Sequence, residues 1–203
     1  MSHSHPVLIG GEGISRCVGY RHRKAEDIDI LSLGDPPLDE SYISSFRSAG
    51  TKVDLISLPA ESASWVANNR PLSVLELNLS ALVFLFESSQ NARSHEGLVV
   101  GSRIGLFVSK AVVIQMRRNV EREARDAFDL CVLSATLDPS DPRWCSLSPD
   151  LRSSIHSALE RFFVDESATT WSRIRSFVLP CLGHADALRG MTSILTLAES
   201  LVR

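Results

Sequence analysis

The sequence predicts a protein of the α/β (α+β) class, in which a small mixed sheet with flanking helices is followed by an α-helical part. Two observations lead to this prediction. Residues 7–9, 27–33 and 52–58 have the short apolar or alternating patterns of strands, and most of the later chain carries apolar residues at helical spacing. We therefore divide the chain into an α/β core, residues 1–100, and a helical C-terminal part, residues 101–203.

Strands and helices alternate along the first part. A strand over residues 7–9 stops at two glycines, and a short helix over residues 12–20 follows. The strand over residues 27–33 ends in a Gly-Asp-Pro-Pro turn, after which Asp39–Gly50 has the cap and spacing of a helix. A proline closes the next strand, residues 52–58.

The remaining elements are expected to be mostly helical. Apolar and polar residues alternate over residues 72–79 well enough for a strand, whereas residues 80–88 could form either a strand or a helix. Residues 107–118 and 120–136 form two helices or one long bent helix, and a proline-rich connector covers residues 138–150. Three further helices are expected over residues 151–163, 168–178 and 185–202.

The composition is that of a globular protein and excludes several functional classes. A net charge of −3 over 203 residues argues against a globally basic nucleic-acid-binding protein, although it leaves room for a local basic patch. The four cysteines contain no C-x-x-C pair, so neither a zinc site nor a disulfide framework is indicated. Signal-peptide and membrane-spanning patterns are also missing, and we expect a soluble cytoplasmic protein with no membrane partner.

Two alternating carboxylates in the second strand are the strongest functional signal. Because successive strand side chains point to opposite faces, Asp27 and Asp29 share one face, while Ile28 and Ile30 can enter the core. Adjacent carboxylates repel each other, and a divalent cation bound between them would remove the repulsion. The alternative is an exposed sheet face with two solvated carboxylates and no ion.

Two neighbouring features favour the metal site over the solvated face. Gly10 and Gly11 lie where a strand passes into a helix, a place where backbone amides can approach phosphate oxygens. Asp54, in the next strand, can add a third carboxylate to the same face. A glycine turn and three carboxylates are the parts needed to hold a nucleoside triphosphate (NTP) and its metal ions for in-line attack.

Together these motifs resemble the DNA polymerase β-like nucleotidyltransferase superfamily, and most of all its AbiEii/MenT-type toxin branch. LIGGEGISRCVGYRHRKAEDIDIL (residues 8–31) is similar to a first motif with two glycines, a basic residue and Asp-Ile-Asp. SKAVVIQMRRNVEREARDAFDLCVL (residues 109–133) is similar to later motifs with a helical lysine, an arginine-rich turn and R-D-x-x-D-L. The resemblance covers about residues 6–58 and 107–134.

The resemblance implies transfer of a nucleoside monophosphate from an NTP to an acceptor hydroxyl, with release of pyrophosphate. For the toxin branch it further implies an RNA acceptor, such as a tRNA end, and an antitoxin protein as partner. The implied catalytic residues are Asp27, Asp29, Asp54 and Lys110, of which the three aspartates bind Mg²⁺ or Mn²⁺. The implied residues for binding the nucleotide are Gly10, Gly11, Arg23, Lys110, Asp126 and Asp129.

Departures from the superfamily pattern keep other functions open. Glu12 stands where relatives often have Ser or Thr, and Ala25 stands where toxin relatives often have a hydroxyl. The basic run of residues 21–24 is either a solvated loop or a phosphate-binding segment. The alternatives are a small-molecule nucleotidyltransferase and a catalytically inactive module of the same fold that acts through protein contacts.

The later motif also has a simpler explanation. Arg122 precedes Asp126 by four residues, and ordinary helical ion pairs form at this spacing. Arg125 precedes Asp129 by the same interval. The sequence therefore leaves open whether these two acids belong to a functional site or only to salt bridges along one helix.

Overall fold

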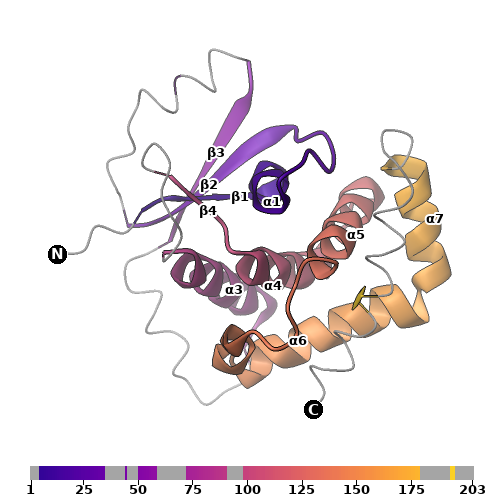
Figure 1. Ribbon diagram of the computed structural model, residues 1–203. Helices are drawn as coiled ribbons and strands as arrows, with labels where there is room; N and C mark the ends of the chain where they lie inside the picture. The colour runs from indigo at the N-terminus through magenta and orange to yellow at the C-terminus, as the bar shows by residue number, and fades with distance from the viewer. Residues whose placement is uncertain are drawn as a thin grey trace.

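The computed structural model describes residues 5–34, 44, 50–58, 72–90, 98–178 and 193–194. It contains a four-stranded mixed sheet with helices packed against it, which confirms the predicted α/β class (Figure 1). The strand order is β3–β2–β1–β4. These strands are β1 (Val7–Ile9), β2 (Asp27–Leu33), β3 (Lys52–Leu58) and β4 (Val99–Val100).

Three strands have the bounds that the sequence predicts, and β4 was not predicted. β1 runs antiparallel to β2 and parallel to β4, while β2 and β3 run parallel. In the parallel pair Asp29 lies opposite Asp54, and in the antiparallel pair Asp29 lies opposite Ile9. This register puts the acidic end of β2 at the centre of the sheet, next to the start of the first helix.

Side-chain caps set the starts of the later helices. Ser102, Asn119 and Ser148 each accept a hydrogen bond from a backbone amide of the first turn. A π-helical segment, Glu160–Asp165, continues α6. The α-helices are α1 (Gly10–Val18), α3 (Val74–Ser89), α4 (Arg103–Ile114), α5 (Val120–Ser134), α6 (Pro149–Leu159) and α7 (Ser167–Phe177).

The strand predicted over residues 72–79 is wrong, because α3 covers most of this segment. Ser73 forms a capping box with Glu76, in which the Glu76 amide donates to the Ser73 hydroxyl and the Ser73 amide donates to the Glu76 carboxylate. Further along, the helix is buried on several sides. The helices expected over 39–50 and 185–202 fall outside the described residues, apart from residues 44, 50 and 193–194.

Both faces of the sheet contribute to a hydrophobic core. The larger cluster joins Val7, Ile9 and Leu31 to α3, α4, α5 and α6. A smaller cluster on the opposite face contains Ile28 and Ile30, as the alternation of β2 predicts. The acidic residues of β2 therefore face the side of the sheet on which the helices lie.

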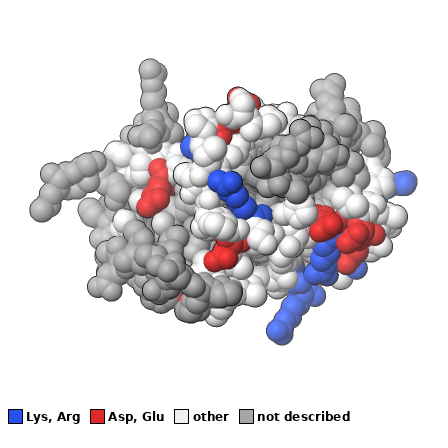
Figure 2. Space-filling view, turned by 90° about the horizontal axis from the view of Figure 1, so that it is seen from below, with Lys and Arg blue, Asp and Glu red and all other residues white. Residues whose placement is uncertain are grey.

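In the view of Figure 1, α3, α4 and α6 lie below the sheet, and α5 and α7 lie to its right. Viewed from below, the surface carries acidic and basic side chains close to one another (Figure 2). Within the described part of the chain, every helix is too short or too polar to cross a membrane.

Candidate functional site

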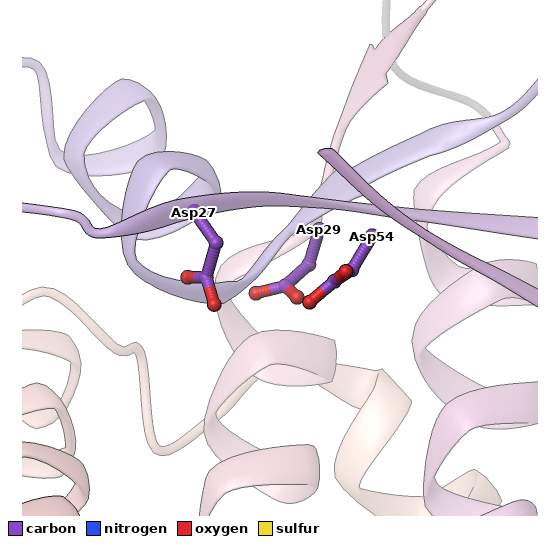
Figure 3. Close-up of side chains that lie close together, drawn as sticks. All are labelled: Asp27, Asp29 and Asp54. Atoms are coloured by element: carbon purple, nitrogen blue, oxygen red, sulfur yellow. The ribbon is translucent and has the colours of Figure 1, made fainter. Parts of the chain in front are cut away.

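Three aspartates come together at the acidic end of β2. Ligand atoms of Asp27, Asp29 and Asp54 all lie within 4.8 Å of one another. Their side chains point to the same side, toward the helices (Figure 3). The prediction that Asp54 joins the pair on one face is confirmed, and the arrangement follows from the two-residue period of β2 and the parallel register with β3.

This proximity is electrostatically unfavourable for Asp29. Its pKa is raised by burial and by the negative charges of Asp27 and Asp54, while Lys110 and Lys52 act in the opposite direction. Lys52 Nζ lies 2.6 Å from Asp54 Oδ2, and this hydrogen bond raises the pKa of the exposed lysine. Carboxylates that repel each other in this way gain from binding a cation.

The two glycines let the first turn of α1 approach the charged groups. Gly10 has φ +63°, and a Cβ atom there would lie 2.0 Å from Asp29 Oδ2. A Cβ atom at Gly11 would lie 2.8 Å from Nη2 of Arg23. The helix starts at Gly10, two residues earlier than predicted, so its N-terminal turn lies against the site.

A substitution can test this close approach. Gly10→Ala combines a strained backbone with a steric clash, so we expect it to displace Asp29 and to cost more than the roughly 1 kcal/mol typical of alanine in left-handed backbone. Gly19→Ala is the matched control, since Gly19 has φ +83° and open space around the position of a Cβ atom. Urea unfolding of both variants measures the difference, and equal losses of stability would contradict the close packing.

The carboxylates share a cavity of about 290 Å³ with a set of basic side chains. Acidic residues of β2 and β3 lie on one side, and basic residues of α4, α5 and the turn between these helices lie on the other. The cavity is thus lined by charges of both signs. Its lining residues are Gly11, Arg23, Glu26, Asp27, Asp29, Lys52, Asp54, Lys110, Arg117, Arg122, Arg125 and Asp126.

Asp129 binds three side chains, two of which, Arg23 and Lys110, line this cavity. Arg23 binds it through two hydrogen bonds, from Nε to Oδ1 at 2.7 Å and from Nη2 to Oδ2 at 2.8 Å. Lys110 Nζ lies 2.9 Å from Oδ2, and His22 Nε2 lies 2.8 Å from Oδ1. Burial alone would raise the pKa of this fully buried carboxyl, but Lys110 and Arg23 hold it well below its usual range.

Asp126, three residues before Asp129 on α5, also binds basic side chains that line the cavity. The carboxylate accepts hydrogen bonds from Lys110 Nζ and Arg117 Nε, each at 2.5 Å. Burial opposes the positive charge of Lys110, yet Asp129 and Asp126 together raise its pKa. Lys110 is therefore a charged side chain, only 12% exposed, held at the wall of the cavity.

These contacts differ from the i,i+4 ion pairs along one helix that the sequence offers for the later motif. Asp126 and Asp129 are bound by residues of other segments rather than by the arginines four positions earlier on α5. Arg125 instead pairs with Glu26 at 2.7 Å and with Glu121 at 2.5 Å. The structure thus brings both acids into the same charged cluster as Lys110 and Arg23.

Sequence reasoning missed His22 as part of this cluster. The imidazole is buried, with Nδ1 2.9 Å from Ser15 Oγ and Nε2 2.8 Å from Asp129 Oδ1. Because ionised Asp129 can only accept, His22 Nε2 donates to it, while Nδ1 is hydrogen-bonded to the Ser15 hydroxyl. The basic run at residues 21–24 does not reveal that His22 and Arg23 turn inward while Arg21 and Lys24 are exposed.

Glu12 is not among the residues that line the charged cavity. Its carboxylate accepts a hydrogen bond from Arg16 Nε at 2.9 Å and lines a second cavity together with Ala25. The charge of Glu12, which stands where relatives often have Ser or Thr, is thus paired with Arg16 and does not line the charged cavity. Comparisons of the chain with known protein families, curated proteins and solved structures give no match.

Proposed function

We propose that the protein is a metal-dependent nucleotidyltransferase that transfers a nucleoside monophosphate from an NTP to an acceptor hydroxyl. The supporting observation is that the triad Asp27, Asp29 and Asp54 shares a cavity with Lys110 and Arg117. An NTP with its cations presents both signs of charge. Carboxylates on one wall suit the cations, and basic side chains on the other suit the phosphates.

The carboxylate triad fits Mg²⁺ or Mn²⁺. Oxygen ligands from Asp27, Asp29 and Asp54 are close enough to one another to share a hard divalent ion. Lys52 now bonds Asp54, but its side chain is 70% exposed and can swing away without losing packing. When bound, the cation supplies charge neutralisation at the triphosphate and at the attacking oxygen.

The chain's own residues would hold the substrate and move the proton. Gly10 and Gly11 admit the phosphates to the first turn of α1, and Lys110 counters their charge together with Arg23. Asp54 positions the acceptor hydroxyl and takes its proton. The acceptor oxygen then forms a bond to the α-phosphorus as the bond to the bridging oxygen breaks, and pyrophosphate leaves.

The resemblance to the toxin branch suggests the acceptor and the partner. RNA such as a tRNA end is the proposed acceptor, an antitoxin protein is the proposed partner, and the cytoplasm is the proposed compartment. Incubation with each labelled NTP, Mg²⁺ and total RNA tests this, with labelled RNA and released pyrophosphate as the expected products. Labelled small molecules instead of RNA would indicate a small-molecule enzyme, and NTP binding without any product would indicate an inactive module.

Lys110 provides a test of the phosphate wall. Lys110→Ala should weaken NTP affinity by about 1–3 kcal/mol, the range for losing a hydrogen bond to a charged group. Lys110→Arg should recover only part of the affinity, because a planar guanidinium fills space differently from a compact ammonium. Calorimetric titration with Mg²⁺–NTP measures both variants.

Arg175→Ala is the control, since Arg175 is an exposed basic residue of α7 that lines neither of the two cavities. Lys110 also pairs with Asp126 and Asp129, so circular dichroism must show that each variant is folded before titration. Wild-type affinity in folded Lys110→Ala would restrict the role of Lys110 to structure.

A further inference from the structure

A second cavity, of about 580 Å³, adjoins the charged one. Among the described residues, Asp27 is the only one that lines both cavities. The second cavity lies on the side of the first helix that carries Glu12, Ser15 and Arg16, and it extends past the end of this helix to Tyr20. Asp27 thus stands at the junction of two spaces with different linings.

Buried contacts hold the inner wall of the second cavity in place. Ser15 lines the cavity, and its hydroxyl is bonded to His22, which is in turn bonded to Asp129. Asp129 also binds Arg23 and Lys110 at the charged cavity. The same buried chain of hydrogen bonds therefore supports both cavities, and we expect the second one to be largely formed before any ligand binds.

The lining of the second cavity suits an aromatic ring that carries a phosphate. Tyr20 lines it and is 44% exposed, so its ring offers a surface on which a planar group can stack. Arg21 lines it and is exposed, and a guanidinium can bind phosphate oxygens in a fork. Thr51 adds a hydroxyl, while the charge of Glu12 is paired with Arg16.

We propose that this second cavity binds the acceptor substrate, and that the acceptor is a nucleotide whose base stacks on Tyr20 and whose phosphate is bound by Arg21. This inference rests on the proposed function. In-line transfer requires the attacking oxygen and the leaving pyrophosphate to lie on opposite sides of the α-phosphorus. The phosphate-binding side chains are gathered in the charged cavity, so the acceptor enters from the second cavity at Asp27. There its hydroxyl can reach Asp54, because ligand atoms of these two aspartates lie within 4.8 Å of each other.

Two kinds of acceptor carry both a base and a phosphate: a free nucleotide and the end of a polynucleotide. The cavity exceeds the charged one in volume and has exposed residues on its lining, so both kinds can enter it. Direct binding measurements distinguish them. One arm uses nucleoside monophosphates, and the other uses short fluorescent oligoribonucleotides with a free 3′-hydroxyl.

The experiment saturates the charged cavity with Mg²⁺ and a non-hydrolysable NTP analogue, and then measures acceptor binding by calorimetry or fluorescence anisotropy. Tyr20→Ala should weaken binding at least about fivefold, as expected for loss of base stacking, and Tyr20→Phe should keep most of it. Arg21→Ala should weaken binding and lower the slope of log affinity against log salt by about 0.7 for one lost single-strand phosphate contact.

Matched controls come from α7, on the helical side of the molecule. Phe177→Ala removes an aromatic ring that is 45% exposed, and Arg175→Ala removes an exposed arginine. Neither control should change acceptor affinity. Equal effects of Tyr20→Ala and Phe177→Ala would overturn the acceptor site, as would wild-type protein that binds Mg²⁺–NTP but neither acceptor probe. Failure to bind Mg²⁺–NTP at all would instead overturn the proposed activity.

Discussion

Replacing Asp129 with asparagine is expected to destabilise the protein by about 3–5 kcal/mol, the cost of removing one partner from a buried ion pair. Asp129 is fully buried and neutralises Arg23 and Lys110, both of which are only 12% exposed. An amide keeps the volume of the side chain but supplies no charge, so Asp126 alone, which also pairs with Lys110, would offset the repulsion between the two cations. The amide oxygen could still accept from His22 and Arg23 Nε at the Oδ1 position, but the NH2 group would then face Arg23 Nη2 and Lys110 Nζ, which are donors themselves.

Urea unfolding at neutral pH measures this loss, with Asp165→Asn as the control. Asp165 is exposed on the helical side, and its substitution should change the free energy of unfolding by no more than about 0.5 kcal/mol. Similar values for the two variants would show that Arg23 and Lys110 do not need the negative charge of Asp129.

The lowered pKa of Asp129 predicts how the loss of stability caused by Asp129→Asn depends on pH. A carboxyl whose folded pKa lies below its unfolded value adds stability that is present above about pH 3.9 and lost as pH falls through the folded pKa. The difference in stability between wild type and Asp129→Asn should therefore stay constant from neutral pH to about pH 5 and shrink only in stronger acid. A difference that disappears near neutral pH would contradict this.

The sheet and the acidic triad could be predicted because both depend on short-range rules. Glycine and proline residues mark the ends of β2 and β3, and alternation assigns each side chain to a face. Once two strands are parallel neighbours, Asp54 has to lie on one face or the other, and the register places it opposite Asp29. The metal-site hypothesis needed no knowledge of the rest of the chain.

The partners of α5 could not be predicted, because they come from distant segments. Asp129 contacts His22 and Arg23 across more than one hundred residues of sequence, whereas the i,i+4 rule offers only a local partner. Tertiary packing, rather than helical spacing, determines the partners of Asp129. The error at α3 has a related origin, since its apolar residues alternate at the start, while a capping box and burial on several sides favour a helix.

The largest functional effect is expected for Asp27→Asn combined with Asp29→Asn, which should abolish metal-dependent NTP binding and leave the fold intact. With ligand at about 100 times Kd, binding adds about 2.7 kcal/mol to the stability of the wild type, and it should add nothing to the double variant. Thermal unfolding with Mg²⁺ and each NTP measures this. Glu160→Gln with Asp165→Asn is the control, because it removes two exposed charges on the helical side.

Without metal, the double variant should be at least as stable as the wild type. The raised pKa of Asp29 explains the direction of this difference. Burial and the neighbouring acids raise its pKa, so its contribution to stability is complete below about pH 3.9 and is lost as pH rises through the folded value. An asparagine does not ionise and therefore keeps its contribution to stability. The stability difference in favour of the variant should grow as pH rises through the folded pKa of Asp29. A less stable variant at neutral pH would mean that Asp27 and Asp29 serve the fold, and an NTP-induced shift equal to that of the wild type would remove the metal-site proposal.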